Sequence, residues 1–327
     1  MTMQLRGWVE LNGKKLTRDD VGEIVRDAPG SARGFGGEFL LSWGNCAARD
    51  TFGIIPGGIS PGSIICNGKL VGRVDPSVPV MDLGEALKEA VRLRCDQGVV
   101  ALSGGVDSSL VAALAGLPCL AAGIEGSFDL ERAGRAATLL GLECDRVVIR
   151  RNEIEDALRR VLEVIPQKNP VDASIATTLY FVAREAAARG HERVLSGQGA
   201  DELFGGYARY LSAPDPEAER ERDIAGLMAQ GERDQAVASL HGVYLSLPYL
   251  DLRVFRSARS IPAGRLIQGG VRKHPLRLVA ERHIPPELAF AEKKAMQYGS
   301  GISNEIRKLA RLKGFHNVRD YLGSLLE

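Results

Sequence analysis

The sequence predicts an α/β protein, with a doubly wound parallel sheet, a helical C-terminal part and a small β-rich domain at the N-terminus. Two observations predict this fold class. Between residues 98 and 196, short apolar runs alternate with helical periodicities, which is typical of a parallel sheet covered by helices. Before residue 75, Gly-rich turns separate short runs that are apolar or alternate in polarity, which indicates strands.

The β-rich domain is expected to span residues 1–75, where Gly, Pro and Asn separate the strands. Its expected strands are 4–10, 37–43, 63–66 and 69–74. Pro76 and Pro79 then indicate a hinge. The second domain is expected to span 80–327 and to open on a helix, because the apolar residues from Leu83 onward keep a helical period.

The second domain alternates strands and helices as a doubly wound sheet requires. The expected strands are 98–102, 118–124, 145–149 and 192–195, and the expected helices are 106–115, 129–141, 153–164 and 172–189. Beyond residue 210 the pattern predicts helices, and the highly charged segment 215–234 is expected to be a solvated helix pair. A ligand of such a sheet binds at the carboxyl ends of the strands.

The strand-to-helix turn at residues 102–109 gives the clearest chemical signal. Gly104 and Gly105 let the backbone approach an anion, and the following helix start offers free N–H groups and a positive dipole end. Hydroxyl donors come from Ser103, Ser108 and Ser109. Asp107 fits beside phosphates if it carries Mg²⁺. The turn therefore predicts ATP pyrophosphate chemistry; the alternative is a Gly-Ser turn in which Asp107 or Ser108 only caps a helix.

A second glycine loop, Ser196-Gly197-Gln198-Gly199, follows the expected strand 192–195. The carboxyl ends of parallel strands share one edge of a sheet, so both glycine loops are expected to converge on one crevice. Polar residues near the start of the helix 172–189, such as Asn169 and Asp172, are candidates for the substrate pocket or are helix caps.

Composition narrows the class of protein. The chain has 327 residues, 45% hydrophobic and 25% charged, with a net charge of +1, which are ordinary globular values. These values disfavour a dedicated nucleic-acid binder and a disordered acidic protein. The segment 253–313 is locally basic, with 14 Lys and Arg against 4 Asp and Glu, and is expected to present a positive surface that could face phosphates.

The five cysteines are predicted to be buried or incidental thiols. They are Cys46, Cys66, Cys95, Cys119 and Cys144. Their spacing contains no C-x-x-C pair, which argues against a zinc cluster or a redox motif. An odd number of cysteines without a signal segment fits a reducing compartment. Because no apolar run approaches the roughly 20 residues of a membrane helix, we expect a cytoplasmic enzyme.

Together, the two glycine loops resemble the synthetase domain of the asparagine synthetase family. The matching segments are 103–109 and 195–207, with supporting matches at 126–129, 247–251 and 293–301. The likeness covers about residues 80–310. It implies a sheet of the adenine nucleotide alpha hydrolase-like type. It also implies an enzyme that adenylates a carboxylate with ATP, releases pyrophosphate and lets an amine displace AMP.

The resemblance also implies the site residues. Those that would bind ATP and its pyrophosphate are Leu102, Ser103, Gly104, Gly105, Asp107, Ser108, Ser109, Ala122, Ser196 and Gly197. Asp107 and Asp201 match the two magnesium carboxylates, and both follow glycine turns at strand ends, although Asp201 could instead be a helix N-cap. Lys294 matches the lysine that stabilises the transition state of adenylation, with Lys293 as the alternative.

The N-terminal part departs from the family. Glutamine-dependent members begin with a glutaminase domain, about twice as long as residues 1–75, in which a cysteine follows the initiator methionine. Here that residue is Thr2, and segments 37–43 and 48–57 are similar only to the last strands and turn of that domain. We therefore expect a truncated remnant, with nitrogen supplied by free ammonia, a separate subunit or an amine substrate.

Gln198 is a second departure, because asparagine synthetases carry a glutamate here that is thought to take a proton from the attacking amine. Glutamine cannot act as a base, and general-base assistance is typically worth about 10²–10⁴-fold. The β-lactam synthetases also replace this glutamate. The usual arginine shortly before the Pro-x-Leu-Asp segment is absent as well, which weakens aspartate as the substrate.

The sequence thus predicts an amide ligase that uses ATP and Mg²⁺ and forms AMP and pyrophosphate, with Lys294 and Gln198 as catalytic candidates. Its expected partners are a small carboxylate, aspartate included, and ammonia or an amine. One alternative is a tRNA-modifying ATP pyrophosphatase, which the basic segment favours but the near-zero net charge disfavours. Another is a nucleotide-binding pseudo-enzyme. The oligomeric state, a homodimer included, stays open.

Overall fold

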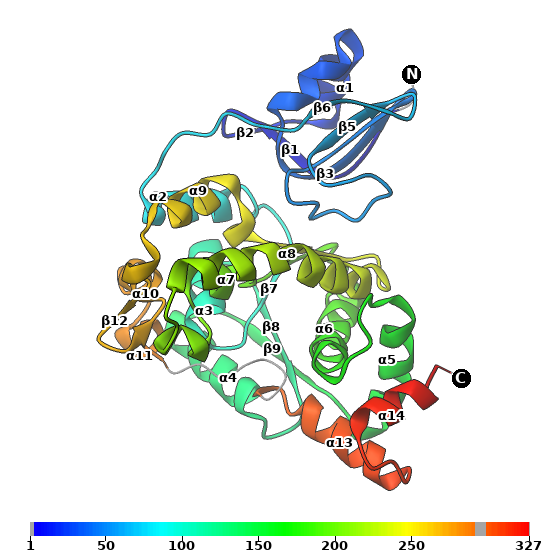
Figure 1. The fold of residues 1–327 in the computed structure, drawn as a ribbon, viewed down its shortest axis with the longest axis vertical. Coiled ribbons are helices and arrows are strands. Elements are labelled where there is room, and N and C mark those ends of the chain that lie inside the picture. Colours follow the sequence, from blue (N-terminus) through cyan, green and yellow to red (C-terminus); the bar gives the residue numbers. More distant parts are fainter. Residues whose placement is uncertain (1–2, 292–298, 327) are drawn as a thin grey trace. The chain divides into compact units, whose positions relative to one another are not determined.

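The computed structural model describes residues 3–291 and 299–326 (Figure 1). The chain divides into two compact units: residues 1–93 with 249–261 form the first, and residues 94–248 with 262–327 form the second. The predicted α/β fold class, with a small antiparallel sheet at the N-terminus, is confirmed. The expected domain boundary at residues 75–80 stays a prediction.

The first unit contains a six-stranded antiparallel sheet in the order β2-β1-β3-β4-β5-β6. Its strands are β1 Met3–Leu11, β2 Lys14–Lys15, β3 Gly36–Trp43, β4 Cys46–Arg49, β5 Ser63–Cys66 and β6 Lys69–Arg73. Alternate residues of β1 and β3, such as Val9, Phe39 and Leu41, form a hydrophobic core with helix α1 (Arg18–Asp27). The helix was not predicted, although Thr17 and Asp20 form a capping box at its start.

The loop after β4 is held by one buried carboxylate. Asp50 accepts backbone N–H bonds from Ile54 at 2.8 Å and from Phe39, Phe52 and Ile55 at 3.2 Å. Burial raises the pKa of Asp50 to about 6, while the bonds from Ile54 and Ile55 oppose this rise.

The segment 249–261 is joined to the first unit by helix packing and by a buried ion cluster. Helix α9 (Leu252–Ser260) packs against α2 (Leu83–Arg92). The Arg253 guanidinium lies 2.6 Å from Glu10 of β1 and 3.1 Å from Asp251, and all three side chains are buried. The predicted helix from Leu83 onward is therefore present, and it packs within this unit.

Two cysteines correct the sequence prediction. Cys46 and Cys66 lie opposite one another on the antiparallel strands β4 and β5 and form a disulfide. Twenty residues separate them in the sequence, and strand pairing, not spacing, brings them together. Cys119 and Cys144 are not bonded in this way, and burial raises the pKa of Cys119 to about 12, which suits a structural thiol.

The second unit is built on a five-stranded parallel sheet in the order β11-β10-β7-β8-β9. The strands are β7 Val99–Ala101, β8 Cys119–Gly123, β9 Cys144–Val148, β10 Arg193–Leu195 and β11 Tyr244–Ser246. The chain starts at β7, moves outward through β8 and β9, and then returns to place β10 on the other side of β7. The strand order therefore reverses between β7 and β10, where a doubly wound sheet binds its ligand.

Helices cover both faces of this sheet (Figure 1). They are α3 Val106–Ala115, α4 Phe128–Leu140, α5 Arg151–Val164, α6 Pro170–Ala188, α7 Ala200–Phe204, α8 Pro216–Ser239, α10 His274–Ala280, α11 Pro286–Ala289, α13 Ile302–Leu312 and α14 Val318–Ser324. Helices α3 and α4 pack on one face, whereas α6 packs on the other and is flanked by α5 and α8. None of the helices among the described residues is long and apolar enough to cross a membrane.

The region beyond residue 210 differs from the prediction in two respects. It contains the edge strand β11 and a small hairpin, β12 Ile267–Gln268 with β13 Val271–Arg272, whose two-residue strands are too short to give a periodic signal. The charged segment 215–234 is also not a solvated helix pair. It lies in the single helix α8, whose Arg220, Asp223, Arg233 and Asp234 are buried because their charges are paired.

Candidate active site

The two glycine loops meet at the carboxyl edge of the parallel sheet. Strands β7 and β10 are hydrogen-bonded neighbours, so the loops that follow them emerge side by side. Gly197 makes the approach close, because a Cβ on this residue would lie 2.9 Å from the Ser108 nitrogen and 3.0 Å from Asp107 Cβ. The structure therefore brings the segments 102–109 and 196–199 together.

The first loop has the form of an anion cradle. Gly105 is the N-cap of α3 and supplies no side-chain cap, so the first N–H groups of the helix stay available. Gly104 adopts φ 72°, and its carbonyl accepts a hydrogen bond from Arg132 at 2.9 Å. The hydroxyls of Ser103 and Ser108 lie 3.1 Å apart. Within the described residues, the buried Ser109 hydroxyl has no hydrogen-bond partner.

Asp107 and Asp201 converge on one ammonium group. Lys273 Nζ lies 2.5 Å from Asp107 Oδ2 and 2.7 Å from Asp201 Oδ1. The Lys273 side chain is only 2% exposed, while the two carboxylates are 16% and 20% exposed. Neither aspartate serves as a side-chain helix cap, because Gly105 and Gly199 occupy the N-cap positions of α3 and α7. Instead, both carboxylates pair with the same cation, the Lys273 ammonium.

Backbone geometry holds this lysine in place. Lys273 sits between β13 and α10 with φ 58°, in the left-handed region that non-glycine residues rarely adopt. Gly206 lies beside it, and a Cβ there would fall 1.7 Å from Asp201 Oδ1 and 2.4 Å from Lys273 Cε. Burial lowers the pKa of Lys273, and the Asp107 carboxylate opposes that shift.

Gln198 is tied to a second set of buried charges. Its amide Nε2 donates to Asp234 Oδ2 at 2.7 Å. Arg233 donates to both oxygens of Asp234, at 2.7 and 3.1 Å, and reaches Asp172 of α6 at 2.5 Å. Asn169, the expected polar candidate at the start of α6, caps that helix and also donates to Asp172.

The comparison with known families decides the assignment. The family model described as Asparagine synthase matches residues 82–236 and 221–315. This chain belongs to the asparagine synthase family. The predicted resemblance is thereby confirmed, since the matched region contains both glycine loops, both aspartates and Lys273.

Several curated proteins are similar to this member of the asparagine synthase family. A Methanocaldococcus jannaschii protein, provisionally named asparagine synthetase (glutamine-hydrolysing) 1, is 35% identical over 283 residues, covering 72% of this chain and 52% of that protein. Asparagine synthetase B of Escherichia coli is 30% identical over 250 residues, covering 68% and 45%. The enzyme of Asparagus officinalis is 30% identical over 260 residues, covering 70% and 44%. The chain spans about half the length of these relatives.

Two solved structures show a weaker likeness. The NMN synthetase of Francisella tularensis covers 66% of this chain at 14% identity, with a TM-score of 0.28. The NH3-dependent NAD synthetase of Campylobacter jejuni covers 66% at 17% identity, with a TM-score of 0.29. These scores are low, and the topology of the sheet itself carries the fold assignment.

The remaining predicted site residues lie around the same edge. Leu102, Ala122 and Ser196 are buried at or just beyond the carboxyl ends of β7, β8 and β10. Their contact with a nucleotide stays a prediction. Lys294, its alternative Lys293, and Thr2 lie outside the described residues.

Lys273 is the site residue that sequence reasoning missed. It is 166 residues from Asp107, and nothing in its local sequence distinguishes it from the other cations of the basic segment 253–313. The only available signal was that basic excess. The fold, through β13 and the start of α10, selects this lysine from among fourteen Lys and Arg residues.

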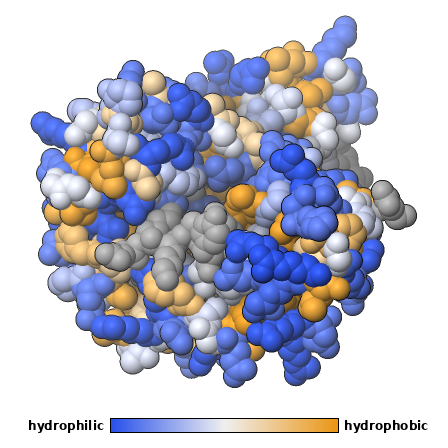
Figure 2. All heavy atoms as spheres, turned by 60° about the horizontal axis from the view of Figure 1, so that its bottom comes forward, coloured by the Kyte–Doolittle hydropathy of each residue, from blue (hydrophilic) through white to orange (hydrophobic). Residues whose placement is uncertain are grey.

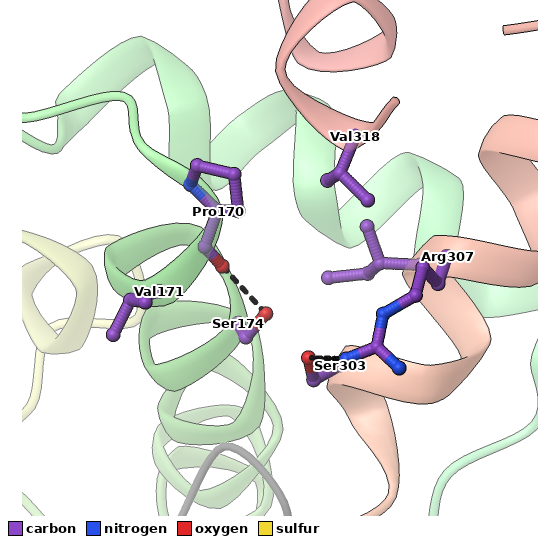
Figure 3. Close-up of a pocket in the computed structure, with 7 residues that line it drawn as sticks. Pro170, Val171, Ser174, Ser303, Arg307 and Val318 are labelled. Carbon is purple, nitrogen blue, oxygen red and sulfur yellow. Dashed lines mark hydrogen bonds between the residues drawn. The ribbon is translucent and has the colours of Figure 1, made fainter. Parts of the chain in front are cut away.

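Two cavities lie along helix α13, and neither is lined by Asp107, Asp201 or Lys273. One, of about 130 Å³, is lined by Pro170, Val171, Ser174, Ser303, Ile306, Arg307 and Val318. Figure 3 shows the Arg307 guanidinium beside Ser303, facing the start of α6. The other, of about 300 Å³, lies between the loop 124–127 and α13 and also includes Arg307. On the face drawn in Figure 2, hydrophilic and apolar residues are interspersed, as on a water-exposed surface.

Proposed function

We propose that this protein is an ATP- and Mg²⁺-dependent amide ligase without a glutaminase of its own. It adenylates a small carboxylate, releases pyrophosphate, and transfers the acyl group to ammonia or an amine. The observation that carries the proposal is the convergence of Asp107, Asp201 and Lys273 on the point where the sheet order reverses. Membership in the asparagine synthase family supports the same reaction class.

The phosphates of ATP would bind on the first glycine loop. Two kinds of donor meet there: the free N–H groups of α3, and the hydroxyls of Ser103, Ser108 and Ser109. Donors that are fixed before the ligand arrives cost little reorganisation when charge builds on the phosphates. This arrangement suits pyrophosphate both in ATP and as the leaving group.

The donor set also fits a magnesium ion. Asp107 and Asp201 supply carboxylate oxygens, and the Lys273 ammonium between them shows that the pair accepts a positive charge at this point. Mg²⁺ usually takes one or two protein carboxylates and leaves its other positions to phosphate oxygens and water. When bound, Mg²⁺ would neutralise negative charge on the phosphates.

Lys273 has a role of its own in this proposal. Its ammonium keeps two carboxylates from repelling one another before ATP binds, and it can donate to a phosphate oxygen after binding. Lys294 is proposed to stabilise the charge that develops on the α-phosphate during adenylation.

The proposal is tested by the products. Purified protein is incubated with ATP, Mg²⁺, ammonium chloride and a panel of small carboxylic acids, aspartate included, and AMP, ADP, phosphate and pyrophosphate are measured. We expect AMP and pyrophosphate in equal amounts with at least one acid. Formation of ADP and phosphate, or no acid-dependent turnover with any acid, would contradict the proposal.

A pair of glycine variants connects the turnover to the carboxylate site. Gly206→Ala should lower acid-dependent pyrophosphate release by about tenfold or more, because its Cβ would displace Asp201 and Lys273. Gly226→Ala in α8 is the matched control, since a Cβ there meets no atom within 4 Å. The control should keep full turnover and gain about 0.5–1 kcal/mol of stability from its better helix propensity. Equal turnover in both variants would place the reaction elsewhere.

A further inference from the structure

The larger of the two cavities along α13 lies between this helix and the loop 124–127, which follows β8. Its volume is about 300 Å³. Both walls belong to the second unit, and Ile124 N donates to the Ser300 carbonyl at 2.9 Å, which joins the loop to the turn before α13. Neither the carboxylate pair nor Lys273 lines the cavity, so the proposed reaction leaves it without a role.

The charges that line this cavity are predominantly positive. They comprise three cations, all on α13, and two carboxylates. One carboxylate, Glu305, is buried and already has two counter-ions, because Lys308 Nζ lies 2.8 Å from it and Arg151 Nε of α5 lies 3.1 Å from it. The other carboxylate, Glu125, is exposed. Glu305 therefore adds no unpaired negative charge to the cavity.

Two guanidinium groups of α13 keep their charge available. Arg307 donates to Asn304 Oδ1 at 3.1 Å and to Ser303 Oγ at 3.4 Å, and both of these acceptors are neutral. The Arg311 side chain makes neither a hydrogen bond nor an ion pair in the part of the chain that the structure describes. The two arginines are four residues apart, so they share one face of the helix, and both are exposed to an incoming ligand.

The opposite wall supplies hydrogen-bond donors. Ser127 lines the cavity and is the N-cap of α4, but its hydroxyl makes no capping bond. The residue is only 9% exposed, and Ser127 Oγ is buried without a hydrogen-bond partner among residues 3–291 and 299–326. The first N–H groups of a helix also lack intrahelical partners. Neither carboxylate of this first turn, Asp129 or Glu131, lines the cavity.

This combination of donors and cations favours an anion with several oxygens. A carboxylate presents two oxygens in one plane, whereas a phosphate group presents three or four that point to different sides. A phosphate can therefore accept from an arginine on one wall and from a hydroxyl or a helix N-terminus on the other.

We propose that this cavity binds a phosphate group, either as inorganic phosphate or as a small phosphate monoester. Arg311 donates to it from α13, with the positive charge of Arg307 one turn away, and Ser127 and the first turn of α4 donate from the loop side. The bound phosphate links the loop after β8 to α13, beside the bond from Ile124 to Ser300. This site is additional to the one in the proposed function and does not depend on it.

Hydrogen exchange measured peptide by peptide locates the binding. The full chain, without ATP or Mg²⁺, is titrated with sodium phosphate, with glycerol phosphate, and with sodium chloride at the same ionic strength. We expect both phosphate compounds, but not chloride, to slow exchange in peptides from 124–131 and 301–312. Tighter binding of glycerol phosphate would identify an organic monoester as the ligand, and tighter binding of inorganic phosphate would identify the free anion. Binding at the first glycine loop is read separately from peptides of 102–109.

Arg311→Met keeps an unbranched side chain and removes the charge. It should raise the phosphate concentration for half-maximal protection of 124–131 and 301–312 about tenfold or more, as the loss of a charge-assisted hydrogen bond predicts. Ser127→Ala should raise the same concentration about fivefold, as the loss of a neutral hydrogen bond predicts. Arg319→Met is the matched control, because Arg319 is an exposed arginine of α14 that lines neither cavity, and it should behave as the parent.

Three results would each overturn the inference: protection confined to 102–109, equal protection by chloride, or the same half-maximal concentration in the parent and in Arg311→Met. None of these measurements requires turnover. A failure of acid-dependent pyrophosphate release would therefore count against the proposed function alone, and a failure of phosphate protection would count against this site alone.

Discussion

At the scale of single residues, Lys273 has the greatest consequence. Two aspartates face each other across two glycine loops, and their mutual repulsion is balanced by one buried ammonium. The lysine holds this position in a left-handed backbone conformation, which costs of order 1–3 kcal/mol and persists only when its surroundings fix it. Strain of this kind concentrates at functional sites.

Replacing this lysine should affect stability and adenylation together. In Lys273→Met two partly buried carboxylates lose their counter-ion, so we expect a loss of about 3 kcal/mol in the free energy of unfolding without Mg²⁺. Added Mg²⁺ should restore more stability in the variant than in the parent, because the metal replaces the missing charge. Pyrophosphate exchange should fall about 10²-fold. Urea unfolding with and without Mg²⁺, and exchange assays, measure these effects.

Lys308→Met is the control for this comparison. Lys308 pairs with Glu305 on α13 and is 58% exposed, so its removal should cost less than about 1 kcal/mol and leave the Mg²⁺ response as in the parent. The same Mg²⁺ response in Lys273→Met and Lys308→Met would contradict the role given to Lys273.

At the scale of elements, the disulfide between β4 and β5 makes a separate contribution. A cross-link that closes a loop of this length is worth about 3 kcal/mol by its effect on the unfolded chain. We expect Cys46→Ser to lower the stability of the first unit by about this amount. Cys144→Ser, which breaks no disulfide, is the control.

Tryptophan fluorescence reports this unit selectively, since the two tryptophans of the chain, Trp8 and Trp43, both lie in its sheet. Equal unfolding midpoints for the two serine variants, or no effect of a reducing agent on the parent protein, would show that the cross-link does not form in solution.

The elements differ in how well the sequence predicts them. Helix α3 has the expected bounds, and the strands from β7 to β10 lie within two residues of the expected positions, because short apolar runs and glycine turns mark them. Strands β12 and β13 have two residues each and show no period, and β11, although as long as β7, is not followed by a glycine turn that would mark it. The burial of helix α8 was not predicted, because its charged pattern is that of a solvated helix. The residues that pair with its buried charges, such as Asp172 and Gln198, come from distant segments.

The same distinction applies to the candidate site. Asp107 and Asp201 could be placed together from the sequence because both follow glycine loops at strand ends. Lys273 and Asp234 could not, since each reaches the site through tertiary packing and neither lies in a glycine loop. Local sequence patterns locate the two glycine loops. The charged residues that pair with side chains of these loops are brought there only by the fold.

At the scale of the whole molecule, the segment 249–261 interrupts the second unit. Residues of the second unit flank it in the sequence on both sides, but the segment itself belongs to the first unit. Arg253 anchors it through Glu10 and Asp251. The first unit is thus assembled from two stretches of chain that lie more than a hundred residues apart.

Arg253→Met should destabilise the first unit by about 3–5 kcal/mol, because it removes a cation that pairs with two buried carboxylates. Hydrogen exchange should rise in α9, and tryptophan fluorescence should show earlier unfolding in urea. Arg256→Met is the matched control, since Arg256 on the same helix forms a solvent-exposed pair with Asp75 and should contribute less than about 1 kcal/mol. Equal losses of stability in the two variants would contradict the claim that the ion cluster anchors this segment.

The two-stretch construction of the first unit also limits how genes of this kind can recombine. An exchange after residue 93 would deliver strands β1 to β6 and α2 but leave α9, with its Arg253, encoded in the other partner. A recombinant would then place Glu10 of one parent against the α9 of another, and a mismatch at either position would leave a buried charge without this ion pair. Inheritance of the β-rich unit is therefore linked to a short stretch within the synthetase region, and the two should diverge together.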